Sequence, residues 1–231
     1  MEPAPRRSPL RRAAKDAGHA ALDAAAALGR AAGLLRPRTR GIEDIDLVLA
    51  PDDELRAEWP ALRPGYQALH RLAAASAPRR IVEIGVRRGT SAFALLSAAP
   101  DAEYLGLDAD VCTWGGVPGA LWDARRMLRR EFPRARITVR RQDTAAPGLR
   151  LPAADLYFVD GDHSREGCAR DLALCAAAAD PQRGALLLVD DVTHERGVAE
   201  AVEAFAKERG LQPVMHPTLR GLAVFALRAR G

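Results

Sequence analysis

From Pro78 onward, short apolar runs rich in β-branched residues alternate with stretches of helical periodicity. This alternation limits the possible folds more than any other feature, because it is typical of a parallel sheet covered by helices on both faces. Seven strands are predicted: Arg80–Gly85, Tyr104–Asp108, Arg136–Arg140, Leu156–Asp160, Ala185–Asp190, Gln212–His216 and Ala223–Arg228.

The last two predicted strands are separated only by residues 217–222, which is too short for a crossover helix. They should therefore form an antiparallel hairpin. We expect an α/β fold with a Rossmann-like, doubly wound, seven-stranded sheet, mostly parallel, with N-terminal helices in addition.

The region before residue 64 differs in composition and is predicted to be a helical arm and connector, residues 1–63. Residues 64–231 then form the catalytic domain. An Ala- and Leu-rich helix is expected over Leu10–Leu35, and two short helices over Asp52–Trp59 and Tyr66–Ala75. The long helix offers a surface for a homo-oligomer.

Charge is unevenly distributed along the chain. Residues 1–40 hold nine Arg or Lys and three acidic residues, a net +6, which leaves −2 of the chain's formal +4 for the remainder. Because this basic excess lies on the arm, a nucleic-acid partner is not expected.

The three cysteines, Cys112, Cys168 and Cys175, have no CxxC spacing and cannot all pair, which favours a reducing, cytoplasmic location. An Arg-rich organellar transit peptide is the alternative reading of the arm. No apolar run approaches the length of a membrane-spanning helix.

A glycine-containing turn follows the first predicted strand. Gly85 and Gly89 stand between the strand and an apolar helix, in the order that a nucleotide site requires. Their G-x-x-x-G spacing differs from the G-x-G-x-x-G of dinucleotide sites, and Arg87 and Arg88 crowd the turn. The second strand ends in Asp108, where a carboxylate can accept hydrogen bonds from ribose hydroxyls. A nucleoside cofactor is therefore expected.

The segment from Glu83 through Gly85 and Gly89 to Ser91, followed by Leu-Asp108, resembles the first two motifs of class I S-adenosylmethionine-dependent methyltransferases. The resemblance implies that Glu83 and Gly85 contact the methionyl part of S-adenosylmethionine and that Asp108 holds its ribose. Gln142 and Asp143 follow the third strand, at the position that commonly brackets the adenine; a polar loop without a ligand is the alternative.

Two neighbouring strands end in acidic residues: Asp160 and Asp162 after the fourth, Asp190 and Asp191 after the fifth. Their mutual repulsion favours a compensating cation, and hard oxygen ligands suit Mg²⁺ or Ca²⁺. The alternative is that Asp162 or Ser164 and Asp191 only cap the helices that follow.

The run Val-Asp160-Gly-Asp162-His163 is similar to a bacterial methyltransferase family acting largely on secondary metabolites and sugars. Related metal-dependent O-methyltransferases imply that Asp160, Asp190 and Asp191 hold Mg²⁺, with Asp160 also bordering the cofactor. The patterns of the related methyltransferases place the general base at different positions. We narrowly favour Asp162 as the base. His163 is the alternative, either as the base or as a contact to the substrate.

The sequence thus predicts a Mg²⁺-dependent O-methyltransferase acting on a hydroxyl of a small molecule, such as a sugar or natural-product scaffold. Metal-independent N- or O-methylation is the first alternative. A NAD-dependent oxidoreductase and a noncatalytic cofactor-binding protein are less favoured, because of the glycine spacing and the intact acidic residues respectively.

Overall fold

The computed structural model describes residues 40–113 and 115–227, all within one compact unit that begins at Arg38. The predicted helix over Leu10–Leu35, and with it the proposed oligomer surface, lies outside the described residues. Within them, no helix is long and apolar enough to cross a membrane.

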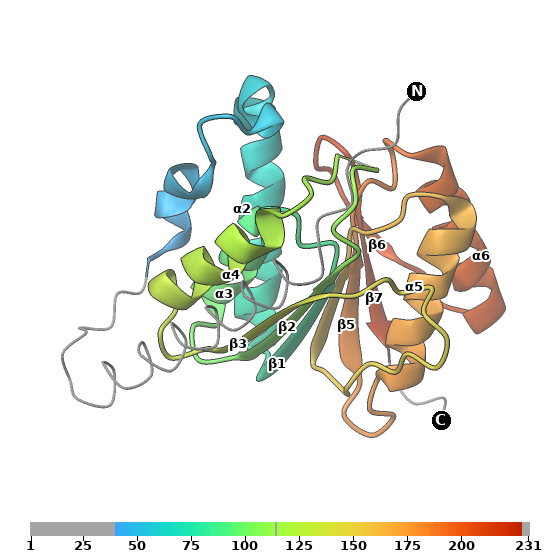
Figure 1. Ribbon diagram of the computed structural model, residues 1–231. Coiled ribbons are helices and arrows are strands. Elements are labelled where there is room, and N and C mark those ends of the chain that lie inside the picture. The colour runs from blue at the N-terminus through green and yellow to red at the C-terminus, as the bar shows by residue number, and fades with distance from the viewer. Residues whose placement is uncertain (1–39, 114, 228–231) are drawn as a thin grey trace. The chain divides into compact units, whose positions relative to one another are not determined.

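The domain is built on one seven-stranded sheet with the order β3-β2-β1-β4-β5-β7-β6 (Figure 1). All neighbouring strands pair in parallel from β3 to β5, whereas β7 is antiparallel to both β5 and β6. The predicted mostly parallel sheet and its closing hairpin are confirmed. The strands are β1 Arg80–Ile84, β2 Glu103–Asp108, β3 Arg136–Arg141, β4 Leu156–Val159, β5 Ala185–Val189, β6 Val214–His216 and β7 Leu222–Leu227.

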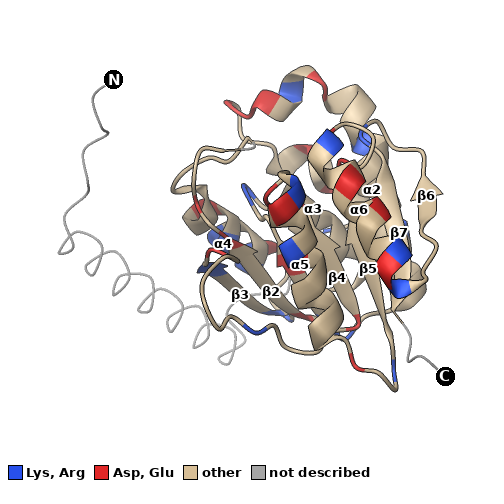
Figure 2. Cartoon of the chain, turned by 90° about the vertical axis from the view of Figure 1, so that its right-hand side faces the viewer, with Lys and Arg blue, Asp and Glu red and all other residues tan. Residues whose placement is uncertain are grey.

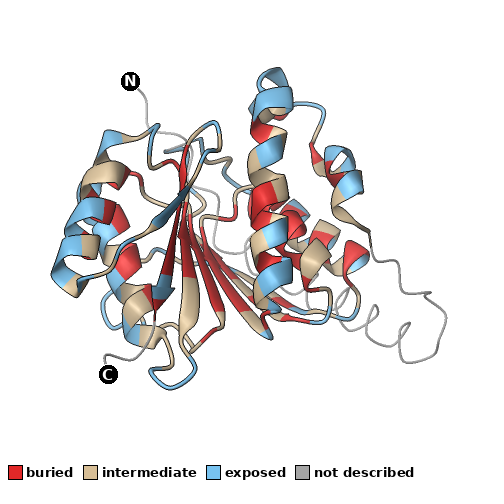
Figure 3. Cartoon of the chain, turned by 180° about the vertical axis from the view of Figure 1, so that it is seen from behind, coloured by how far each residue is buried: buried red, intermediate tan, exposed pale blue. Residues whose placement is uncertain are grey.

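Helices cover both faces of the sheet, which explains why the central strands β4 and β5 are apolar throughout rather than alternating (Figures 1 and 3). One face packs against α2, α3 and α4, and the other against α5 and α6. The helices are η1 Ile42–Val48, η2 Glu54–Ala57, α2 Trp59–Ser76, α3 Thr90–Ala98, α4 Ala120–Glu131, α5 Arg165–Ala178 and α6 Arg196–Arg209.

The connector before β1 differs from the prediction of two short helices. Only the single turn η2 forms within the first predicted range, and α2 continues through Pro64 for 18 residues. Pro64 lies near the start of α2, where its missing N–H removes one hydrogen bond, to the carbonyl of Pro60. Burial of Leu62, Leu69 and Ala73 against the core compensates for this loss, so the helix is not broken.

The outer surfaces of α5 and α6 carry acidic and basic residues interspersed (Figure 2). The opposite stripe of α6, formed by Val198, Ala201, Val202 and Phe205, is buried as its periodicity predicts. These two helices form the outer layer on their face of the sheet.

The carboxyl ends of the central strands meet at one edge of the sheet. The amide of Gly85 donates to the carbonyl of Leu107, and that of Asp160 donates to the carbonyl of Ile84, both at 2.8 Å. Gly85 has φ +91°, and a Cβ at this position would lie 1.8 Å from the carbonyl oxygen of Asp160. The turn after β1 therefore requires glycine, both for its backbone conformation and for its contact with the end of β4.

We expect Gly85→Ala to lower the free energy of unfolding by roughly 3 kcal/mol or more, since overpacking adds to the left-handed backbone cost. Gly210→Ala is the matched control, because Gly210 has φ +61° and no atom within 4 Å of its Cβ position. Its cost should be about 1 to 2 kcal/mol. Urea denaturation measures both; equal losses would contradict the close approach at Gly85.

Candidate functional site

A cavity of about 760 Å³ opens at the carboxyl ends of β1, β2, β4 and β5. Its size suits a small-molecule ligand, and its position is the one at which open α/β sheets bind ligands. The predicted site residues that line it are Gly85, Ser91, Asp108, Gln142, Asp143, Asp160, Asp162, His163 and Asp191. Glu83, Gly89 and Asp190 are absent from this lining.

Asp108 joins the end of β2 to the glycine turn. One carboxylate oxygen accepts hydrogen bonds from the amides of Val86 and Arg87, at 2.9 and 2.8 Å, and the other accepts one from Asp110 at 2.6 Å. The oxygen that accepts from Asp110 can accept a second hydrogen bond. Asp108 can therefore hold the turn in place and still accept from a ligand in the cavity.

Glu83 lies behind the glycine turn. It is fully buried and accepts hydrogen bonds from the hydroxyls of Ser91 and Tyr104, the latter at 2.7 Å. Burial raises the pKa of Glu83 to about 8. The structure gives Glu83 a position that connects β1, β2 and α3, and its predicted contact with a cofactor stays a prediction. Gly89 precedes α3 as its N-cap, with φ +85°.

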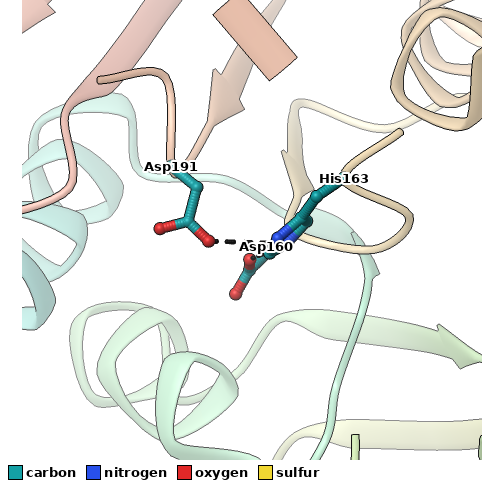
Figure 4. Close-up of side chains that lie close together, drawn as sticks. All are labelled: Asp160, His163 and Asp191. Atoms are coloured by element: carbon teal, nitrogen blue, oxygen red, sulfur yellow. Dashed lines mark hydrogen bonds and ion pairs between the residues drawn. The ribbon is translucent and has the colours of Figure 1, made fainter. Parts of the chain in front are cut away.

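Asp160, His163 and Asp191 form a compact group whose side-chain donor atoms all lie within 4.8 Å of one another (Figure 4). Nε2 of His163 lies 3.3 Å from a carboxylate oxygen of Asp160 and 3.4 Å from one of Asp191. The two carboxylates raise the pKa of His163 against the opposing effect of its burial. Burial and the charge of Asp160 raise the pKa of Asp191 to about 6.

The donor set of this group fits a divalent cation. Two carboxylates and an imidazole are ligands of Mn²⁺ and related ions as well as of Mg²⁺, although Mg²⁺ prefers oxygen alone. The second oxygen of Asp191 is buried and has no hydrogen-bond partner among the described residues. It is ion-paired with the guanidinium of Arg220 at 3.7 Å, and a bound cation would share it.

Asp190 does not belong to this group. It borders a separate cavity of about 40 Å³, together with Tyr66, Thr218 and Arg220. Burial, and then the charges of Asp160 and Asp191, raise the pKa of Asp190 well above its usual range. The structure therefore brings two of the three predicted metal ligands together and leaves the third outside the group.

Asp162 is held by the start of α5. It accepts a hydrogen bond from the amide of Ser164 at 2.9 Å, and its other oxygen lies 3.4 Å from Arg170. Burial acts to raise its pKa, but these partners outweigh burial and lower it. Ser164 caps α5 through a hydrogen bond from Gly167, whereas Asp191 makes no side-chain cap to α6, so the capping alternative holds for only part of the cluster.

Arg220 is a residue of the site that the sequence did not indicate. It lines both cavities, and its guanidinium lies 3.7 Å from both Asp191 and Glu58. Arg220 lies in the short connection between β6 and β7. Only the insertion of β7 beside β5 brings that connection next to the acidic residues, and no local sequence signal reveals this.

Residues 82–192 match the model of a family described as a methyltransferase domain. These residues form a methyltransferase domain. The family match supports the predicted enzyme class, a methyltransferase. No curated protein matches the sequence at a significant level.

Several solved structures share the fold of this methyltransferase. The O-methyltransferase TomG from Streptomyces achromogenes, solved with S-adenosylmethionine, is 19% identical, with a TM-score of 0.56 over 83% of this chain and 92% of that one. The methyltransferase PaMTH1 from Podospora anserina is 17% identical, with a TM-score of 0.57 over 89% and 96%. An O-methyltransferase from Bacillus cereus is 15% identical, with a TM-score of 0.55 over 84% and 94%. At this level of identity, the similarity establishes the class I methyltransferase fold.

The buried Glu83 should make the stability of this methyltransferase depend on pH. Its pKa rises from the usual 4.5 to about 8 in the folded state, so the folded chain binds a proton that the unfolded chain releases. The stability contributed by the protonated group is complete below pH 4.5 and is lost as the pH rises toward 8.

Glu83→Gln reproduces the protonated form and should remove this dependence, a difference of up to about 4 kcal/mol between pH 5 and pH 8. Urea denaturation at both pH values measures it. Glu203→Gln, at an exposed position of α6, should keep the full dependence of the wild type. An unchanged pH dependence in Glu83→Gln would show that Glu83 is ionised in the folded protein.

Proposed function

We propose that this methyltransferase transfers a methyl group from S-adenosylmethionine to a hydroxyl of a small molecule, with the help of a divalent cation. The observation that carries the proposal is a single cavity, lined mostly by the matched residues, that joins the turn held by Asp108 to the group formed by Asp160, His163 and Asp191. The end of the cavity at Asp108 suits a nucleoside, and the end at Asp160, His163 and Asp191 suits an acceptor hydroxyl.

The cofactor is proposed to lie across the carboxyl ends of β1 and β2. Asp108 accepts from the ribose hydroxyls, while Gln142 and Asp143 border the adenine and the Gly85 turn borders the methionyl part. Bound in this way, S-adenosylmethionine supplies an electrophilic methyl group. The backbone amides of Val86 and Arg87 keep Asp108 oriented, because each donates to its carboxylate.

The acceptor is proposed to lie at the other end of the cavity. Asp160 and Asp191 would hold the cation, which would lower the pKa of the acceptor hydroxyl, and His163 would not be a ligand. Asp190, predicted as a further ligand, lies in the adjoining small cavity and contributes negative charge to the same region. Correct placement of the acceptor oxygen would supply much of the rate enhancement.

For the general base we propose His163 rather than the narrowly favoured Asp162. Asp162 accepts hydrogen bonds from the amide of Ser164 and from Arg170, and these interactions favour its ionised form. His163 lines the cavity between two carboxylates, which orient its ring. A proton from the acceptor hydroxyl would pass to the imidazole.

Metal-independent methylation is the second candidate, and Arg220 favours it. Its guanidinium lies 3.7 Å from Asp191 and so already places positive charge among the acidic residues. In this alternative, His163 and Arg220 would compensate the acidic charge. The acceptor class is supported by TomG, which takes part in tomaymycin synthesis; a sugar or natural-product hydroxyl remains our proposal.

Calorimetric titration tests the cofactor and the cation. S-adenosylmethionine should bind saturably and NAD⁺ should not, and Asp108→Asn should weaken binding by about tenfold or more, the effect of one charged hydrogen bond. Mg²⁺ or Mn²⁺ should bind to the wild type but not to Asp160→Asn or Asp191→Asn. Asp101→Asn is the control, since Asp101 is an exposed residue just before β2, at the opposite edge of the sheet.

Absence of S-adenosylmethionine binding in a folded sample would refute the proposed function. Cofactor binding without any cation binding, together with turnover that survives EDTA, would favour the metal-independent alternative.

Substitution separates the two candidate bases. With an acceptor that is turned over, His163→Ala should lower kcat by about 10² to 10⁴, the usual contribution of a general base, while Asp162→Asn should lower it by no more than about tenfold. Formation of S-adenosylhomocysteine measures the rate, and the affinity for S-adenosylmethionine controls for indirect damage. A larger loss in Asp162→Asn at unchanged cofactor affinity would reassign the base to Asp162.

A further inference from the structure

Arg87, one of the two arginines in the glycine turn, joins three separate segments of the chain. Its guanidinium donates to both carboxylate oxygens of Asp53, at 2.9 and 3.1 Å, and to Glu54 at 3.0 Å. Its Nε donates to the carbonyl of Gly115 at 2.8 Å. The planar guanidinium can make these bonds at once because its donors point in fixed, divergent directions.

Each of these segments borders the large cavity. Glu54 belongs to η2, Gly115 belongs to the loop between β2 and α4, and Arg87 itself belongs to the turn after β1; all three line the cavity. They are far apart in the sequence, and the hydrogen bonds of one side chain connect them. Because that side chain leaves the glycine turn itself, the contacts bind two outlying segments to the proposed cofactor site.

The partner of Arg87 is buried. The side chain of Asp53 is fully shielded from solvent, and it also caps η2 by accepting from the amide of Leu55 at 3.0 Å. A buried carboxylate is costly unless it is paired. Loss of the Arg87 guanidinium would therefore leave Asp53 with only the more distant guanidinium of Arg88, at 3.7 Å, and would weaken the hold on the start of η2. By contrast, the neighbouring Arg88 donates to Asp52, whose side chain is 76% exposed.

The backbone at Arg87 is unusual in a way that fits this role. Its φ is +48°, a left-handed conformation that costs a residue with a Cβ about 1 kcal/mol or more. In this conformation its amide reaches Asp108 while its side chain reaches Asp53. A glycine would avoid the backbone cost but would lack the guanidinium.

We propose that Arg87 is a positioning residue that holds η2 and the β2–α4 loop around the cofactor cavity, and thereby sets the affinity for S-adenosylmethionine without taking part in methyl transfer. The proposal rests on the proposed function, because it assumes that the cavity binds this cofactor. It assigns a role in ligand binding to residues of the connector before the catalytic domain.

Calorimetry with S-adenosylmethionine and with S-adenosylhomocysteine tests the proposal. Arg87→Met keeps an unbranched side chain and removes all the donors, and it should raise both dissociation constants by at least about tenfold. Arg87→Lys keeps the charge but not the forked geometry, and it should give an intermediate increase. Arg183→Met is the matched control, since Arg183 forms an exposed pair with Asp180 at 2.8 Å, and it should bind like the wild type.

Two further measurements distinguish positioning from general stabilisation. Hydrogen exchange of the ligand-free protein should become faster in η2 and around Gly115 in the Arg87 variants, but not in β4. In a double-mutant cycle, Arg87→Met and Asp53→Asn together should weaken cofactor binding little more than Arg87→Met alone, because both remove one interaction.

The outcomes separate this inference from the proposed function. If the wild type binds neither ligand, the proposed function itself fails. If the wild type binds both, and a folded Arg87→Met binds them as tightly, the positioning role is overturned and the cofactor assignment stands. Fully additive effects of the two substitutions would also overturn it.

Discussion

The close approach of Gly85 to Asp160 is the contact on which the site depends. The carbonyl oxygen of Asp160 occupies the place where a Cβ of residue 85 would lie, so the ends of β1 and β4 can meet without an intervening side chain. The turn after β1 is then positioned to donate its amides to Asp108. The same contact fixes the start of the loop that carries His163. Both halves of the cavity thus share one backbone contact.

The sheet could be predicted from the sequence because its central strands are buried on both faces and are therefore apolar throughout. The antiparallel pairing of β6 and β7 followed from a connection too short for a helix, whereas the insertion of β7 beside β5 did not. The extent of α2 could not be predicted in this way. A proline commonly marks a helix boundary, but Pro64 lies close enough to the start of α2 to be tolerated, and only tertiary packing of Leu62 and Leu69 shows that the helix continues.

The sequence indicated which residue types lie near the cavity but not the direction in which each side chain points. Asp190 and Asp191 are adjacent acidic residues at the end of β5, and the sequence does not distinguish them. In the structure, Asp191 adopts φ +61° and joins Asp160 and His163, while Asp190 faces the smaller cavity. Likewise Glu83 belongs to the recognised motif, but successive residues of a strand point to opposite faces, and its side chain is buried beneath the turn.

The position of Arg220 has a consequence for how such a site can diversify. Arg220 lies in a surface connection between β6 and β7, and β6 is a short edge strand with exposed Val214 and Met215. Substitutions in that connection can change the charge beside Asp191 without disturbing the parallel strands that form the cofactor end of the cavity. Selection for a new acceptor can therefore act on the final hairpin while the cofactor end of the cavity stays unchanged.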